Sequence, residues 1–216
     1  MKALSLITRR DDLDRQAFRN YYESTHCLLA MKYFPFAQYV RNHLLDAEDL
    51  DFDCITEVRL AQVLDVGRIM RSESRNRVLD DEAQFMRQEM IRVGSAHELL
   101  LSDWRDIKPA GGCAGERVVV LLPPNASATA QLVRAQTLLQ VLAGGEFYDI
   151  KASLDQLQKG ASILPFAALL WLEAENIEEL QSSLTRALKG DERCIRVATC
   201  RSDADELKER FVAFLP

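Results

Sequence analysis

The sequence of 216 residues predicts an α+β protein built from two tandem copies of one unit. Segments with alternating apolar residues and segments with apolar residues three and four apart follow one another in the order β-α-β-β-α-β. The same order then occurs a second time, which indicates an internal repeat. Residues 108–115, rich in glycine, alanine and proline, separate the copies and have the composition of a linker. We therefore predict domains at 1–107 and 116–216.

The first copy contains four predicted strands and two helical regions. The strands cover residues 2–9, 36–45, 54–60 and 90–101. A turn rich in aspartate, residues 11–14, supplies N-caps for a first helix that reaches about Met31 and has an apolar stripe. Pro35 closes that segment, because the residue before a proline disfavours the helical conformation. A more polar helix or pair of helices is predicted at 65–86.

The second copy repeats this pattern and adds a short terminal helix. Its strands are predicted at 116–122, 146–154, 163–173 and 193–201, and its helices at 127–142, 176–188 and 203–214. The order in each copy is that of the ferredoxin-like fold. A four-stranded antiparallel sheet with both helices on one face leaves its other face bare. We therefore expect the two ferredoxin-like sheets to pack face to face within the chain.

Composition excludes several classes of protein. The net charge of −6 is modest and spread along the chain, which argues against a nucleic-acid partner. No window approaches the roughly 18 apolar residues of a membrane span, and the N-terminal apolar run is too short for a signal peptide. The five cysteines are odd in number and form no C-x-x-C pair. We therefore expect a cytoplasmic protein with free thiols.

The stretch from Phe18 to His43 concentrates the chemistry-bearing residues. It holds two of the three histidines, and His26 is the best candidate for a catalytic group because imidazole titrates near neutral pH. Tyr22 and Glu23 lie four and three residues earlier, so either could reach the ring along a helix face. The alternative is a structural histidine bonded to nearby backbone.

The second strand presents two faces that alternate along the chain. Tyr39, Arg41 and His43 share one face, and Val40, Asn42 and Leu44 share the other. We expect the apolar pair on the second face to lie under the first helix, which would place Asn42 near that helix. Arg41 and His43 would then lie between the sheets, apart from His26.

Two interpretations of Arg41 and of His43 stay open. Arg41 could bind a carboxylate or an enolate oxygen, or it could form a salt bridge with Glu57. His43 could act in catalysis or lie at the solvated mouth of a barrel. His97 is expected to be exposed or structural, and the acidic residues 80–82 are interpreted as a solvated helix face.

The motifs Phe18-Arg19-x-Tyr21-Tyr22-Glu23-x-x-His26 and Tyr39-Val40-Arg41-Asn42-His43 resemble the EthD-type proteins of the dimeric α+β barrel superfamily. The resemblance covers roughly residues 1 to 105, and it implies an α+β barrel and a small, often aromatic substrate. The family often has a proline two residues after the histidine, whereas this chain has Leu28. The first helix is therefore expected to continue past His26.

We predict a cofactor-independent enzyme that acts on a small aromatic or polyketide-like metabolite. It would be a dehydratase, isomerase, cyclase or decarboxylase. His26 would remove a proton alpha to a carbonyl, Asn42 or Arg41 would steady the oxyanion, and Tyr22 and Tyr39 would bind substrate. The alternatives are a non-catalytic binding or structural barrel and a haem enzyme with an axial histidine. No motif indicates a nucleotide, and three dispersed histidines argue against a metal. The second half, without histidine, is predicted to be a structural lid, in a monomer or homodimer.

Overall fold

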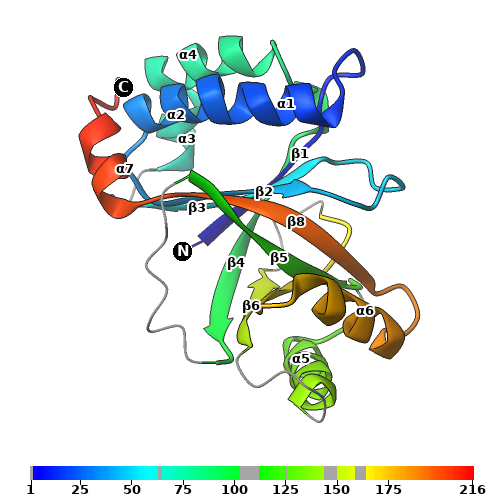
Figure 1. Ribbon diagram of the computed structural model, residues 1–216. Coiled ribbons are helices and arrows are strands. Elements are labelled where there is room, and N and C mark those ends of the chain that lie inside the picture. Colours follow the sequence, from blue (N-terminus) through cyan, green and yellow to red (C-terminus); the bar gives the residue numbers. More distant parts are fainter. Residues whose placement is uncertain (1, 63–64, 103–111, 125, 144–149, 159–163) are drawn as a thin grey trace.

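Eight strands form one closed barrel in the part of the chain that the computed structural model describes, which is residues 2–62, 65–102, 112–124, 126–143, 150–158 and 164–216. Helices cover the barrel on two opposite sides (Figure 1). The strands are β1 (Lys2–Ile7), β2 (Phe36–Leu44), β3 (Cys54–Leu60), β4 (Arg92–Leu100), β5 (Gly112–Leu122), β6 (Lys151–Leu157), β7 (Ala168–Glu173) and β8 (Arg193–Ser202). The predicted α+β barrel is therefore present.

The order of strands around the barrel is the same in both halves. The first half runs β4-β1-β3-β2 and the second runs β8-β5-β7-β6. Antiparallel pairing of β2 with β8, and of β4 with β6, joins the halves. The halves therefore meet through hydrogen-bonded strand edges, whereas the sequence predicts face-to-face packing of two sheets.

A continuous helical segment covers the first half (Figure 1). It consists of α1 (Arg15–Tyr21), the π-helical turn η1 (Tyr22–His26) and α2 (Cys27–Tyr33). The Asp14 side chain caps it by accepting a hydrogen bond from the backbone amide of Ala17 at 2.7 Å, and Phe18 is buried against the sheet. The helix continues past His26, as the absence of a proline at position 28 predicts.

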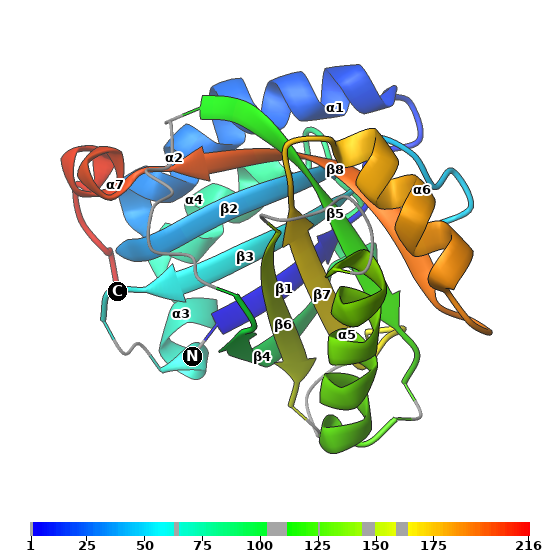
Figure 2. The same cartoon turned by 60° about the horizontal axis from the view of Figure 1, so that its bottom comes forward.

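The remaining α-helices follow the predicted positions with adjusted ends, whereas the short 3-10 turn at 88–90 was not predicted. They are α3 (Val66–Met70), α4 (Glu73–Glu82), the 3-10 turn η2 (Gln88–Met90), α5 (Ala128–Ala143), α6 (Ile177–Ala187) and α7 (Ala204–Arg210). Figure 2 shows α5 and α6 over the second half, with α7 beside the end of β2. Asn176 caps α6, since its side chain accepts from the amide of Glu179.

The barrel interior has an apolar end and a charged end. The apolar end is filled by residues such as Leu6, Phe52 and Trp171, all buried. At the charged end, the ammonium of Lys2 lies within 2.8 Å of three carboxylates, those of Glu57, Glu98 and Asp155. One cavity, lined by Glu57, Glu98 and Arg117 among others, lies at the charged end. Another, lined by Phe52, Leu121 and Phe166 among others, borders the apolar end.

The structure bears on the predicted linker and on the predicted free thiols. β5 begins at Gly112, inside the predicted linker, and residues 103–111 lie outside the described part, so the division into two domains stays a prediction. Cys27, Cys54 and Cys194 are free thiols, whereas Cys200 is disulfide-bonded, so the expectation of free thiols throughout was wrong. Among the described residues, no helix combines the length and the apolar character needed to span a membrane.

Candidate active site under the first helix

The π-helical turn η1 presents Tyr22, Glu23 and His26 to the sheet. A π-helical turn widens the helix locally, and such turns are frequent at functional sites. Tyr22 and His26 are buried in this turn, whereas the side chain of Glu23 is 18% exposed. The three side chains meet residues from β2 and from α4, so this layer between helix and sheet brings chemistry-bearing groups together.

His26 is held by a carboxylate. Its Nδ1 lies 2.8 Å from Oδ2 of Asp81, and the hydroxyl of Tyr21 donates to the other oxygen of that carboxylate at 2.8 Å. Partial burial raises the pKa of Asp81, but the hydrogen bonds from His26 and Tyr21 lower it more, so the carboxyl stays ionised. An ionised carboxylate accepts a hydrogen bond from Nδ1–H, so the proton stays on Nδ1 and Nε2 of His26 carries the lone pair.

His43 is held by a second carboxylate. Its Nε2 lies 2.7 Å from Oε1 of Glu23, while Oε2 of the same carboxylate accepts a hydrogen bond from Nη2 of Arg41 at 2.7 Å. Burial lowers the pKa of His43, and Glu23 opposes this shift. A neutral His43 donates Nε2–H to Glu23. Its Nδ1 is buried and has no hydrogen-bond partner among the described residues.

Tyr22 lies between the two histidines. Its ring centroid is 5.0 Å from that of His26 and 5.5 Å from that of His43, and both contacts are edge-on. Its hydroxyl forms a 3.0 Å hydrogen bond with the hydroxyl of Thr56. Burial raises the pKa of Tyr22 far above its ordinary value, so the hydroxyl keeps its proton. Phe85 covers His26 from the other side, at 4.8 Å between ring centroids.

A comparison with known protein families finds a match that includes the residues of this helix–sheet layer. The family model described as the EthD domain matches residues 10–89. This segment of the chain is similar to the EthD family. It contains the paired histidines and both carboxylates that hold them. No match was found among curated proteins.

Solved structures resemble the chain over different lengths. A protein described as anthrone oxidase-like is 12% identical, with a TM-score of 0.54 over 94% of each chain. An ethyl tert-butyl ether D (EthD) family protein from Bacillus halodurans C-125 is 17% identical, over 44% of this chain and 97% of its own, with a TM-score of 0.35. The likeness to the anthrone oxidase-like protein shows that a closed barrel with helices on two sides is a known fold.

The structure places the residues of β2 on the faces opposite to those expected. Tyr39, Arg41 and His43 do share a face, but that face lies under the first helix. Arg41 donates to Glu23 and to the hydroxyl of Ser202, and it lies 4.6 Å from the ring centroid of Tyr39. The inferred separation of Arg41 from the His26 side was therefore wrong. Its salt bridge is with Glu23 and not with Glu57, the partner considered in the alternative interpretation.

Asn42 lies on the other face, inside the barrel. Its amide donates to Oε1 of Glu57 at 3.0 Å, and its carbonyl oxygen accepts from Arg117 at 2.7 Å. The prediction of Asn42 beside the first helix was therefore wrong. The physical reason is that Val40 and Leu44 pack into the barrel, so both faces of β2 are buried and their polarity does not distinguish helix from interior.

Sequence reasoning missed the residue that holds His26. Asp81 belongs to the acidic run 80–82, which has the pattern of a solvated helix face. Glu23, expected to hold His26, holds His43 instead. Only the folded position of α4 brings Asp81 within 2.8 Å of His26, 55 residues earlier in the chain. His97 is exposed on β4, as expected.

Two groups of possible metal ligands occur among the described residues. Glu23, His43 and Cys200 form the first, with ligand atoms within 4.8 Å of one another. Cys200 is disulfide-bonded and Glu23 already binds Arg41, so this set offers no complete coordination sphere. The second is Glu57, Glu98 and Asp155, whose oxygens surround the ammonium of Lys2. That ammonium supplies the positive charge that a metal ion would bring.

Proposed function

We propose that this chain is a cofactor-independent enzyme acting on a small aromatic or polyketide-like molecule, with His26 as general base. The observation that carries the proposal is the 2.8 Å contact between Nδ1 of His26 and Asp81. The contact fixes the tautomer that leaves Nε2 free to accept a proton. Asp81 acts as a positioning residue, and Tyr21 orients it.

The proposed step is removal of a proton from a carbon acidified by a carbonyl group. Nε2 of His26 takes the proton, and the electron pair of the broken C–H bond passes to the carbonyl oxygen as an enolate or phenolate. Arg41 lies on the same side of β2 and supplies positive charge for that oxygen. Tyr22 and Tyr39 offer aromatic surfaces for the substrate. His43, the third catalytic candidate, is a second base or a proton donor to the product.

The class of substrate follows from these surroundings. Phe18, Tyr22 and Phe85 make the layer aromatic around His26 and His43. An anthrone, the compound type in the description of the structural neighbour, has a C–H acidified through its rings by a carbonyl. Dehydration, isomerisation and cyclisation begin with the same proton removal, and decarboxylation ends with its reverse. We propose this shared step rather than one reaction.

The second half has a supporting role in this proposal. Its strand order matches that of the first half, which supports the interpretation of two tandem ferredoxin-like units. The hydrogen bond from Arg41 to Ser202 on β8 fixes the guanidinium from the second half. The second half thus takes the place of the second subunit of a dimer.

A second candidate function is a binding or structural barrel without catalysis. The burial of His26 favours it, because only 4% of that residue is exposed and its ring packs between Tyr22 and Phe85. His26 lines neither the cavity beside Glu57 and Arg117 nor the one beside Phe52 and Phe166. Catalysis would require the Phe85 ring to move aside and admit substrate to Nε2.

Deuterium exchange separates the two candidates without knowledge of the full reaction. The probe is 1,8-dihydroxyanthrone in D2O under nitrogen, with the methylene signal followed by NMR. We expect the native protein to accelerate exchange and His26→Gln to lose that acceleration by roughly 100-fold or more. His97→Gln, which removes the exposed histidine on β4, is the matched control and should exchange at the native rate.

Each outcome has a distinct meaning. Native exchange no faster than buffer supports a barrel without catalysis. A thermal shift on adding the anthrone would then indicate a binding role, and no shift would indicate a structural role. Equal exchange by native protein and His26→Gln removes His26 as the base. A Soret band in the purified protein would show a haem protein and overturn the cofactor-independent proposal.

A further inference from the structure

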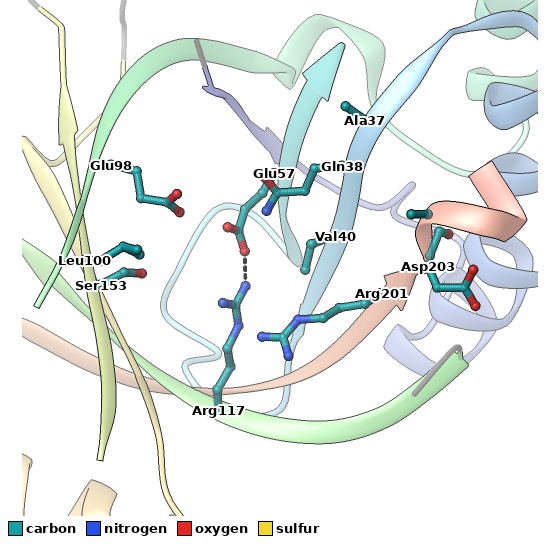
Figure 3. A pocket seen from close by; sticks show the side chains of 12 residues that line it. Ala37, Gln38, Val40, Glu57, Glu98, Leu100, Arg117, Ser153, Arg201 and Asp203 are labelled. Atoms are coloured by element: carbon teal, nitrogen blue, oxygen red, sulfur yellow. Dashed lines mark hydrogen bonds and ion pairs between the residues drawn. The ribbon is translucent and has the colours of Figure 1, made fainter. Parts of the chain in front are cut away.

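A cavity opens at the charged end of the barrel, on the face of β2 opposite to the EthD histidines. Its volume is about 350 Å³, in the range of small-molecule sites. Figure 3 shows Arg117 from β5 and Arg201 from β8 extending toward it, with Glu57 and Glu98 on the facing wall. Leu100, 64% exposed, and Ala37 lie at its rim. The cavity is separate from the proposed active site.

Arg117 is the fixed element of this cavity. It is buried, with its guanidinium carbon 4.0 Å from the ring centroid of Trp171. Nε donates to Asn42 and to the hydroxyl of Thr199, and Nη2 donates to Asn42 and pairs with Glu57. Nη1, in contrast, has only Glu173 at 3.9 Å among the described residues, beyond hydrogen-bond distance.

Arg201 is the more accessible cation. Its side chain is 22% exposed, and Nη2 pairs with Oε1 of Glu173. Among the residues that the structure describes, Nε and Nη1 of Arg201 have no acceptor. The two guanidinium groups therefore bring unused donors to one cavity, both in the neighbourhood of Glu173.

The acidic side of the cavity is already neutralised. Glu57 binds Lys2 and Arg117, while Glu98 binds Lys2 and Arg59. Burial and the nearby Arg201 lower the pKa of Arg117 to about 9, so it remains charged at neutral pH and is repelled by Arg201. An additional negative charge placed between the two arginines would relieve that repulsion.

We propose that this cavity binds the carboxylate of a small organic acid between Arg117 and Arg201. Guanidinium groups bind carboxylates with paired N–H donors in a matching plane. Val40, Leu100 and Ala37 provide an apolar wall for the body of the acid. The ligand is therefore an acid with an apolar portion, and the proposal does not rest on the function of His26.

Calorimetric titration with benzoate tests the site, with benzamide as its neutral counterpart and inorganic phosphate as a second anion, all at equal ionic strength. We expect one benzoate per chain and negligible heat from benzamide. Arg201→Gln should weaken benzoate binding at least about tenfold, because it removes charged donors. Arg201→Lys should recover part of the affinity, and shifts of the arginine Nε–H signals by NMR locate the ligand.

A matched control lies on the same strand. Arg193→Gln removes one positive charge from the other end of β8, where Arg193 is 61% exposed, and should leave benzoate binding unchanged. Equal binding of benzoate by native protein and folded Arg201→Gln would overturn the site. Equal affinity for benzamide, tighter binding of phosphate, or no benzoate binding would overturn the assignment to an organic acid.

Discussion

The Glu23 carboxylate and His43 form a hydrogen bond across the interface between helix and sheet, with 2.7 Å between Oε1 and Nε2. The other oxygen of the carboxylate pairs with Arg41. One side chain of the π-helical turn thus fixes two side chains of β2. Burial raises the pKa of Glu23, but the hydrogen bonds from His43 and Arg41 lower it to about 2, against an ordinary value of 4.5.

This pKa predicts how the stability of the fold depends on pH. A carboxyl whose pKa is depressed in the folded state contributes stability above its unfolded pKa, and loses it as pH falls through the folded pKa. We expect Glu23 to contribute up to about 3 kcal/mol at pH 7, declining between roughly pH 5 and pH 2. Urea unfolding of native protein and Glu23→Gln at pH 7 and pH 3 measures this difference.

The control for Glu23 is Glu73→Gln. Glu73 lies on α4, is 49% exposed and pairs with Arg77 at the surface, so its removal should change the free energy of unfolding by less than about 1 kcal/mol. A stability difference between native protein and Glu23→Gln that stays the same at pH 7 and pH 3 would contradict the prediction.

Lys2 is predicted to be essential to the barrel. Its buried ammonium lies 2.5 Å from Glu57, 2.7 Å from Asp155 and 2.8 Å from Glu98. Lys2→Met leaves three neighbouring carboxylates without this cation, and breaking a buried ion pair from one side costs roughly 3–5 kcal/mol. The free energy of unfolding in urea measures the loss.

Calcium provides a sharper test of the same arrangement. The three carboxylates have oxygens within 4.8 Å of one another, so Lys2→Met should regain part of its stability when Ca²⁺ is added. Lys208→Met, which removes a lysine that is 79% exposed, should neither lose stability nor respond to Ca²⁺. A Lys2→Met protein as stable as the native one would show that the network contributes little.

The fold could be predicted because its signals are local. Alternation marks strands such as residues 54–60, predicted and observed with the same bounds. The starts of two helices could be predicted from Asp14 and Asn176, which cap α1 and α6. The edge pairing of β2 with β8 involves strands about 160 residues apart, and no local pattern specifies it.

The site could be predicted only in part. The alternation that groups Tyr39, Arg41 and His43 on one face follows from strand geometry. Which face meets the helix depends on the barrel, whose interior is charged at one end and accommodates Asn42 as readily as Val40. His26 was found from its residue type and motif.

Replacement of Asp81 is expected to lower the activity of His26 without disturbing the fold. In Asp81→Asn the neutral amide no longer accepts a charge-assisted bond from Nδ1–H, and its amide group can instead donate to Nδ1. Deuterium exchange of 1,8-dihydroxyanthrone should fall roughly 10- to 100-fold, by analogy with other residues that orient a functional histidine. The ¹⁵N shifts of the His26 ring should move from the Nδ1–H tautomer toward Nε2–H, which a purely structural role would not produce.

Asp80→Asn changes the exposed neighbour on the same helix and should alter neither measurement. Native exchange and an unchanged tautomer in Asp81→Asn would mean that His26 is oriented by its packing between Tyr22 and Phe85, and that Asp81 is not a positioning residue.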